Sequence, residues 1–321
     1  MPPRRVIGID AGGTKLLGGV VDDDLVVHHR VHRTWRGADR SETLDIIFEA
    51  VEEVRAAAPD VAAVGFGIPA LVESDTGVAR WSTHLPLAGV RFRDVMSERL
   101  GLPVVVDNDA NAALVAESRA GAARDVRHAV LVALGTGIGS ALLLDGRIYR
   151  GARGLGAEIG HMVIDLHGPD CQGNCPGRGC LEVMASGSTI GREGRAVAAA
   201  LPESALGRRL ASDQEITGGI VTELAHAGDE AAVSVLAQIG RRLGYGLVGV
   251  VNVFNPEKIV IGGGAIAAGE LLLGPAREVV EERALPPMGE MVSIVATEFG
   301  DESGMLGAAL LALDELSSSS A

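Results

Sequence analysis

The sequence predicts a duplicated α/β protein in which two similar lobes face each other across a cleft. Three observations lead to this fold class. The same order of expected elements, three strands followed by helix, strand, helix, strand and helix, occurs twice in the 321 residues. Each half opens with a glycine turn between two apolar runs, which is typical of a β-hairpin. Finally, 47% hydrophobic and 22% charged residues allow a chain of this length to bury a sizeable core.

The first half begins with two apolar runs on either side of the first glycine turn and with a third strand, expected at 6–9, 16–21 and 25–31. Apolar side chains then recur at helical spacing from Leu44 to Val54. Ser41 precedes them and is expected to be the N-cap of this helix. The half continues with a strand, a helix, a strand and a helix, expected at 61–68, 93–100, 104–106 and 109–118.

The second half repeats this order. Its three opening strands are expected at 129–134, 140–144 and 147–150. After a long insertion, a helix, a strand, a helix, a strand and a helix are expected at 231–251, 258–261, 271–282, 291–296 and 305–313. We therefore expect a small lobe at 1–107 and a large lobe at 108–303 that carries the insertion. The C-terminal helix, at 304–316, is expected to complete the small lobe, and a flexible tail is expected at 317–321.

Charge and composition exclude several classes of function. The chain has 28 basic and 42 acidic residues, a formal net charge of -14, whereas a nucleic-acid or anionic-membrane binder needs a basic surface. No stretch approaches the ~18 uninterrupted apolar residues of a membrane span, and no signal-peptide pattern is present. We expect a cytoplasmic protein. All three cysteines lie between Cys171 and Cys180, and such an odd, clustered set favours a metal site over a disulfide framework.

The first glycine turn is a candidate phosphate site. Gly12 and Gly13 are expected to permit positive φ and to let backbone N–H groups approach phosphate oxygens. Thr14 adds a hydroxyl donor, Lys15 adds a positive charge, and Asp10 ends the strand where a carboxylate could hold Mg²⁺ through water. The turn lies between two strands, so it is neither a Walker A motif nor a Rossmann fingerprint. The alternative is that these glycines serve turn geometry alone.

A second motif, Asp107 to Asn111, ends a Val-rich strand and opens a helix. A carboxylate there could take the proton from an attacking hydroxyl. Capping of the helix by Asn or Asp is an equally natural interpretation of the residues alone.

A third motif supplies one nitrogen and three sulfurs within twenty residues. Its members are His161, Cys171, Cys175 and Cys180, a complete tetrahedral set for Zn²⁺ with no open position, as in structural zinc sites. The alternative is three free thiols in a loop.

Together these motifs resemble the superfamily of sugar kinases, Hsp70 and actin, and within it the ROK family (repressors, uncharacterised open reading frames and sugar kinases), particularly its bacterial glucokinases. The resemblance covers nearly the whole chain. It is carried by Asp10–Lys15, Asn108–Asp109, Gly135–Gly139, Glu158–His161, the cysteine cluster with Glu182, and Ile261–Gly264. It implies a duplicated ribonuclease H-like fold with an ATP site and a sugar site.

The resemblance also implies roles for individual residues. Asp109 matches the catalytic base for transfer of the ATP γ-phosphoryl group to the 6-hydroxyl of glucose. The sugar ligands are Asn108, Glu158, His161 and Glu182, and His161 can use its second ring nitrogen for this while the first binds zinc. The nucleotide and Mg²⁺ ligands are Asp10, Gly12, Gly13, Thr14, Lys15, Gly135, Thr136, Gly137, Gly139, Gly262, Gly263 and Gly264. The family suggests a homodimer or homotetramer.

The sequence departs from the family pattern in two places. The usual cysteine run is C-x-C-G-x-x-G-C-x-E, whereas Cys171 here is displaced by two residues. Before Leu85-Pro86 this chain has Thr83-His84, where glucokinases commonly carry Asn before Leu-Pro. Ala70 stands at a position where glycine is frequent in the family. These changes bear on which sugar is preferred.

Other functions stay open. The substrate could be N-acetylglucosamine or N-acetylmannosamine, and polyphosphate could also donate the phosphoryl group. A sugar-sensing ROK regulator would carry an N-terminal helix-turn-helix, for which we expect no room because the first strand begins by Val6. An actin- or Hsp70-like ATPase would need neither the zinc ligands nor the E-x-G-H motif.

Overall fold

The structure is a computed structural model that describes residues 4–35, 37, 39–82 and 85–318. The chain divides into two compact units. Unit 1 comprises 1–127, 141–157 and 297–321, and unit 2 comprises 128–140 and 158–296. Among the described residues, none of the helices combines the length and apolar character needed to cross a bilayer.

Unit 1 is built on a five-stranded sheet with the order β3-β2-β1-β4-β7. The pairs β1–β2 and β2–β3 are antiparallel, and β1, β4 and β7 run parallel. Strands and helices follow the chain as β1 (Arg5–Ala11), β2 (Lys15–Asp22), β3 (Val27–Thr34), α1 (Arg40–Ala57), β4 (Val64–Ile68), β5 (Leu71–Glu73), β6 (Val78–Trp81), α2 (Phe92–Leu100), β7 (Val104–Asn108), α3 (Asp109–Arg119), β10 (Arg147–Tyr149) and, near the C-terminus, the short 3-10 helix η3 (Gly300–Glu302) followed by α11 (Ser303–Ser318).

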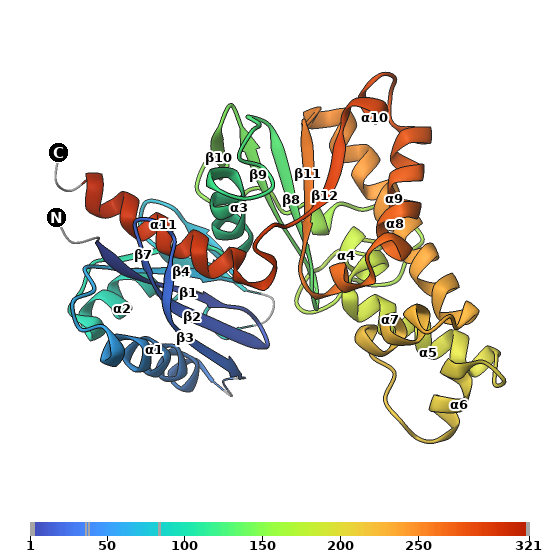
Figure 1. Cartoon of the computed structure of the whole chain (residues 1–321), viewed down its shortest axis with the longest axis horizontal. Helices are drawn as coiled ribbons and strands as arrows, with labels where there is room; N and C mark the ends of the chain where they lie inside the picture. The colour runs from blue at the N-terminus through green and yellow to red at the C-terminus, as the bar shows by residue number, and fades with distance from the viewer. Residues whose placement is uncertain (1–3, 36, 38, 83–84, 319–321) are drawn as a thin grey trace. The chain divides into compact units, whose positions relative to one another are not determined.

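Helices cover both faces of this sheet. α1 and α2 lie on one face, and α3 and α11 lie on the other (Figure 1). Side chains alternate along β1, so Ile7 and Ile9 pack into the core under α1 while Gly8 faces α11. A Cβ at Gly8 would overlap a backbone carbonyl of α11, so glycine is required for the helix to lie directly on the strand. Asp10 continues the same alternation and faces the first turn of α11 at Gly304.

The second sheet has the order β10-β9-β8-β11-β12. As in the first sheet, the two outer strands on one side are antiparallel, here β9 and β10, and three strands run parallel, here β8, β11 and β12, which confirms the predicted duplication. Its remaining elements are β8 (Ala129–Leu134), β9 (Ile138–Leu144), the 3-10 helices η1 (Ile159–His161) and η2 (Gly264–Ala268), α4 (Leu181–Ala185), α5 (Gly187–Ala200), α6 (Ala205–Ala211), α7 (Gly218–His226), α8 (Glu230–Phe254), β11 (Lys258–Gly262), α9 (Glu270–Arg283), α10 (Met288–Met291) and β12 (Ser293–Ala296).

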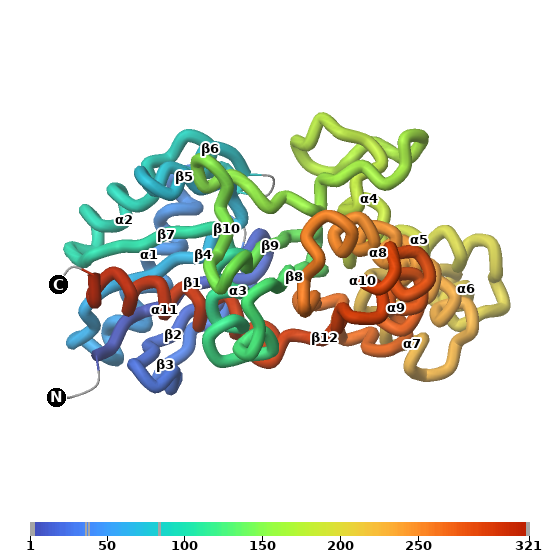
Figure 2. The backbone as a smooth tube through the Cα atoms, turned by 90° about the horizontal axis from the view of Figure 1, so that it is seen from above, coloured from blue at the N-terminus to red at the C-terminus, as the bar shows by residue number. Residues whose placement is uncertain are grey.

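In unit 2 the long helix α8 packs against α9, and α10 lies beside both, as Figures 1 and 2 show from two directions. Gly240 and Gly244 are one helical turn apart on α8, and a Cβ at either would meet a backbone carbonyl of α9. These two glycines therefore allow the helices to approach closely. The insertion predicted between the opening strands and α8 contains η1, the cysteine cluster and α4 to α7.

Three expectations need correction. The N-cap of α1 is Asp39, whose side chain accepts the Glu42 N–H at 3.0 Å, and Ser41 already lies inside the helix. The short strands β5 and β6 form a two-stranded sheet that was not predicted. Of the expected tail at 317–321, Ser317 and Ser318 are the last residues of α11; residues 319–321, like Thr83 and His84, lie outside the described residues.

Candidate functional site

The first glycine turn joins β1 to β2 in unit 1. Gly12 and Gly13 are not among the described glycines with positive φ, so the expected positive φ is wrong, whereas the approach of their N–H groups to phosphate stays a prediction. Close packing also favours glycine at position 12, where a Cβ would lie 3.1 Å from the carbonyl oxygen of Lys15. Trp35 holds the turn from the side: its indole N–H donates to the Gly12 carbonyl at 3.1 Å, and its backbone N–H donates to the Thr14 carbonyl at 3.2 Å.

Three carboxylates gather beside this turn. Burial, and then the charges of Asp109 and Asp301, raise the pKa of Asp10 well above its ordinary value. Lys15 lies 3.8 Å from Asp301, but both side chains are largely exposed, so this pair offsets little of the repulsion. A set of oxygen ligands whose mutual repulsion a cation would relieve suits Mg²⁺. Asp301 was not predicted, because it is distant in sequence from Asp10 and belongs to no motif.

The Asp107–Asn111 motif divides its tasks between neighbouring residues. Asn108 is the N-cap of α3, and its Oδ1 accepts the N–H groups of Ala110 and Asn111 at 3.0 and 3.2 Å. Asp109 is the first residue of the helix, and one of its oxygens accepts the Ala110 N–H at 2.9 Å. Capping is therefore performed mainly by Asn108, and the Asp109 carboxylate lies next to it at the carboxyl end of β7. The Asn108 Nδ2 donates to the carbonyl of Ala70 at 3.4 Å.

Asp107 anchors the motif from beneath. Its Oδ1 accepts the Asn108 N–H at 2.8 Å and the Asn111 Nδ2 at 2.9 Å. Its Oδ2 accepts Nε and a terminal nitrogen of Arg150 at 2.8 and 2.6 Å. Asp107 is buried, so this charge-assisted pair fixes the backbone from which Asn108 and Asp109 project. No local pattern in the sequence marks Arg150 as its partner.

The second glycine turn follows β8 in unit 2. The Gly135 carbonyl accepts the Gly187 N–H, the Thr136 carbonyl accepts Nε2 of Gln172, and the Ile138 N–H donates to Oε2 of Glu182. The third glycine segment begins at Gly262, which pairs with Ala133 on the neighbouring parallel strand. Gly263 has φ of 80°, and a Cβ there would lie 2.6 Å from the Leu134 carbonyl. The segments Gly135–Gly139 and Gly262–Gly264 thus lie side by side at the carboxyl ends of β8 and β11, where α/β sheets bind ligands.

The four predicted metal ligands come together in unit 2. The ligand atoms of His161, Cys171, Cys175 and Cys180 all lie within 4.8 Å of one another. Burial, followed by the neighbouring thiols, raises the pKa of Cys171, and burial likewise raises that of Cys180. Thiols packed this closely resist forming thiolates together unless a cation compensates them, so the donor set fits tetrahedral Zn²⁺. The displaced Cys171 belongs to the cluster, with its Sγ 3.8 Å from His161 Nδ1.

The remaining sugar-ligand candidates flank this cluster. Glu158 is exposed and directly precedes η1, which ends at His161. Glu182 is buried in the first turn of α4, where its Oε2 accepts the Ile138 N–H at 2.8 Å and its Oε1 lies 3.9 Å from Cys171 Sγ. Asn108 and Asp109 belong to unit 1, whereas Glu158, His161 and Glu182 belong to unit 2.

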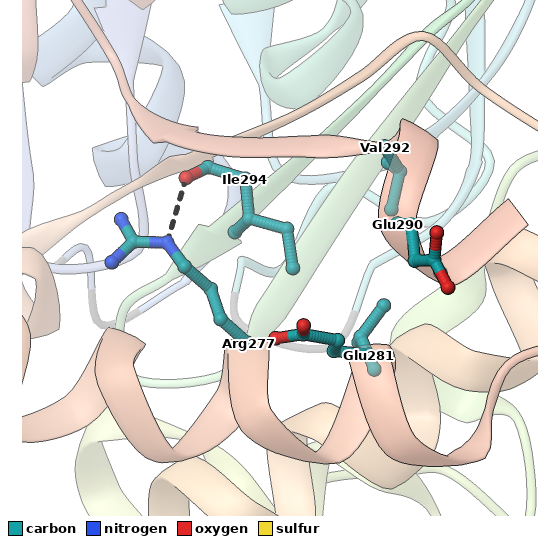
Figure 3. Close-up of a pocket in the computed structure, with 7 residues that line it drawn as sticks. Arg277, Glu281, Glu290, Val292 and Ile294 are labelled. Carbon is teal, nitrogen blue, oxygen red and sulfur yellow. Dashed lines mark hydrogen bonds between the residues drawn. The ribbon is translucent and has the colours of Figure 1, made fainter.

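A separate pocket of about 450 Å³ lies in unit 2 between α9, α10 and β12. Arg277, Glu281 and Glu290 line it, and Arg277 Nε donates to the Ile294 carbonyl at 3.0 Å (Figure 3). Its lining contains none of the predicted site residues, so we do not take this pocket for the active site.

Two sheets of the same strand order, each with a glycine turn after its central strand, define the duplicated ribonuclease H-like fold shared by actin, Hsp70 and sugar kinases. The chain belongs to the ROK family, whose model matches residues 6–315. The resemblance inferred from the motifs is therefore confirmed.

Individual relatives cover nearly the whole chain. A glucokinase of Thermotoga maritima is 34% identical over 96% of this chain and 97% of its own length. The crystal structure of a ROK family glucokinase from Streptomyces griseus in complex with glucose and AMPPNP superposes with a TM-score of 0.89 at 31% identity, covering 97% of this chain and 99% of that one. A ROK family transcriptional regulator superposes with a TM-score of 0.85 at 30% identity over 96% of this chain and 77% of its own. Family membership alone therefore does not distinguish a kinase from a regulator.

Proposed function

We propose that the protein is a glucokinase, which transfers the γ-phosphoryl group of ATP to the 6-hydroxyl of glucose. The observation that carries this proposal is the division of labour at the start of α3. Asn108 caps the helix, while Asp109, at the carboxyl end of β7, lies close enough to Asp10 for its charge to raise the pKa of that carboxylate, and we assign Asp109 the role of general base. A pure regulator or a scaffold protein has no need for such a base. The similarity to a glucokinase that binds glucose and AMPPNP supports the choice of substrates.

In this proposal Asp109 accepts the proton of the sugar hydroxyl as the hydroxyl oxygen attacks the γ-phosphorus, while the bond from the γ-phosphorus to the β,γ-bridging oxygen breaks and ADP leaves. Asp107 and Arg150 hold the backbone that aims Asp109. The sugar hydroxyls are bound by Asn108, Glu158, His161 and Glu182. Glu182 uses Oε1 for this contact, because its Oε2 accepts the Ile138 N–H of the second glycine turn. The backbone N–H groups of the two glycine turns, together with Thr14 and Lys15, bind the nucleotide phosphates. Gly262–Gly264 contact the adenosine.

Two metal ions belong to the proposal. Asp10 would hold Mg²⁺ through water, with Asp301 close by, and Mg²⁺ bound there neutralises charge on the phosphate groups. His161, Cys171, Cys175 and Cys180 would hold a structural Zn²⁺, which keeps His161 in a fixed orientation.

The deciding experiment is a panel of sugars with ATP and Mg²⁺. We expect turnover with glucose that exceeds turnover with mannose, N-acetylglucosamine and N-acetylmannosamine, and we expect the product to be oxidised by a dehydrogenase specific for glucose 6-phosphate. Turnover confined to an N-acetylhexosamine would overturn the choice of sugar. Replacing ATP by polyphosphate in the same assay identifies any second donor.

The similarity to a ROK family transcriptional regulator makes sugar sensing the second candidate. Sugar binding by calorimetry without turnover of any sugar in the panel would favour it. Hydrolysis of ATP at full rate without sugar would instead favour an ATPase that acts on protein partners.

A further inference from the structure

The cysteine loop supplies a hydrogen bond to the second glycine turn. Gln172, directly after Cys171, donates from Nε2 to the carbonyl of Thr136 at 2.9 Å. The two residues lie in the same unit. Gln172 is part of the stretch between Cys171 and Cys175 that is longer than the C-x-C spacing typical of the family. This contact therefore comes from the segment in which this chain departs from the family pattern.

The bond controls the direction of a donor. In a trans peptide the C=O of one residue and the N–H of the next point in opposite directions. Fixing the Thr136 carbonyl toward Gln172 therefore points the Gly137 N–H away from Gln172. The following peptide is fixed as well, because the Ile138 N–H donates to Glu182 Oε2 at 2.8 Å. Glycine gives the backbone at 137 unusual rotational freedom, so these two bonds, one on each flank, select one orientation.

A third bond secures the base of the turn, where the Gly187 N–H at the start of α5 donates to the Gly135 carbonyl at 2.9 Å. All three partners, Gln172, Glu182 and Gly187, belong to the single stretch 171–187 that begins with a candidate zinc ligand. The turn is therefore shaped in advance by this stretch, and preorganised backbone donors are worth more than mobile ones.

We propose that Gln172 is a positioning residue that aims the Gly137 N–H at the phosphate groups of the nucleotide. The inference deepens the proposed function, since it assumes that the turn Gly135–Gly139 binds those phosphates. It assigns Gln172 no contact with the sugar. Loss of its amide N–H should therefore weaken nucleotide binding and leave the sugar affinity unchanged.

The test compares Gln172→Met, Gln172→Ala and Asn174→Ala. Met has nearly the same length as Gln, carries no charge and cannot donate to a carbonyl, so it removes the hydrogen bond without removing the side chain. Asn174 is exposed in the same loop and serves as the matched control. For both Gln172 variants we expect KM for ATP, and the dissociation constant of a fluorescent ATP analogue, to rise about fivefold, the effect of one neutral hydrogen bond. KM for glucose and zinc content should match those of Asn174→Ala.

The outcomes separate the two proposals. If the wild-type protein binds the ATP analogue and both Gln172 variants bind it equally well, the inference is wrong while the proposed function stands. A parallel rise in KM for ATP and for glucose would also overturn it, because that pattern indicates general loosening of the loop. If the wild-type protein does not bind the analogue at all, the proposed function itself fails. Should Gln172→Ala lose zinc, Gln172→Met with its zinc retained decides the question by the same criteria.

Discussion

Glu117 offers a strong test of the forces that hold unit 1 together. It lies fully buried in α3, and its carboxylate accepts four hydrogen bonds. Oε1 accepts the Phe299 N–H at 3.1 Å and the Ser303 hydroxyl at 2.7 Å, and Oε2 accepts the N–H groups of Ala122 and Glu298 at 2.8 and 3.0 Å. The carboxylate thereby fixes the segment that carries Asp301 and starts α11.

The substitution Glu117→Gln replaces one of these oxygens by an NH₂ group of the same size. If the NH₂ group takes the Oε2 position, the N–H groups of Ala122 and Glu298 both lose their acceptor. If it takes the Oε1 position, the Ser303 hydroxyl can turn and accept an amide proton, because it can donate instead to the Gly300 carbonyl, and only the Phe299 N–H loses its acceptor. The second orientation is the less costly one, and an unsatisfied buried donor costs about 1–3 kcal/mol, so we expect a loss of that size in the free energy of unfolding. For a unit of this size that corresponds to a fall in melting temperature of roughly 2–12 °C. Ser303→Ala removes one donor only and should cost about 1 kcal/mol.

The assay is thermal unfolding at pH 7 followed by circular dichroism. Glu98→Gln is the matched control, because it makes the same chemical change at an exposed position on α2. A shift for Glu117→Gln no larger than that of Glu98→Gln would refute the reasoning, since it would mean that a buried N–H group deprived of its acceptor finds another partner at no cost.

Three further predictions concern the site. Asp109→Asn should lower kcat by about 10²–10⁴-fold without lowering the melting temperature, because Asn108 caps α3 and the substitution removes a charge that repels Asp10; a near-wild-type rate would exclude the base. Elemental analysis should find about one zinc ion per chain and less in Cys175→Ser, whereas folded, active wild-type protein without zinc would contradict the metal site. The folded-state pKa of Asp10 is raised, so its charge destabilises the metal-free protein above the unfolded pKa, and acidification relieves this. Asp10→Asn should therefore melt at a higher temperature at pH 7, with a difference that shrinks toward pH 4; equal melting temperatures at pH 7 would count against the repulsion.

The regular elements could be predicted because their signals are local. The opening hairpins alternate around glycine turns, and α8 shows helical periodicity over its whole length. The exact start of a helix depends on finer effects. At the start of α1, Asp39 and Ser41 are both good capping residues. Asp39 is the cap because it is the last residue in the extended conformation before the helix. Strands β5 and β6 are too short for a period, and a register irregularity at Leu71 and Val72 obscures their pairing.

The candidate site was predictable where a motif is contiguous. The cysteine cluster and the Asp107–Asn111 motif each lie in one stretch of sequence, so their residue types and spacing indicate a site. The partners that orient these motifs lie elsewhere in the sequence and could not be predicted. Arg150 on Asp107, Asp301 near Asp10 and Gln172 on Thr136 are single residues brought in by the fold, and a lone Arg, Asp or Gln carries no sequence pattern of its own.

The bond between Trp35 and the first glycine turn gives the molecule an internal optical reporter. The indole of Trp35 is 7% exposed and its N–H is bonded to the Gly12 carbonyl, so its emission responds to any movement of that carbonyl. The chain contains one other tryptophan, Trp81 in β6, and Trp81→Phe leaves a single emitter on the turn. Occupancy of the turn can then be followed by intrinsic fluorescence, without a label and whether or not the ligand is turned over.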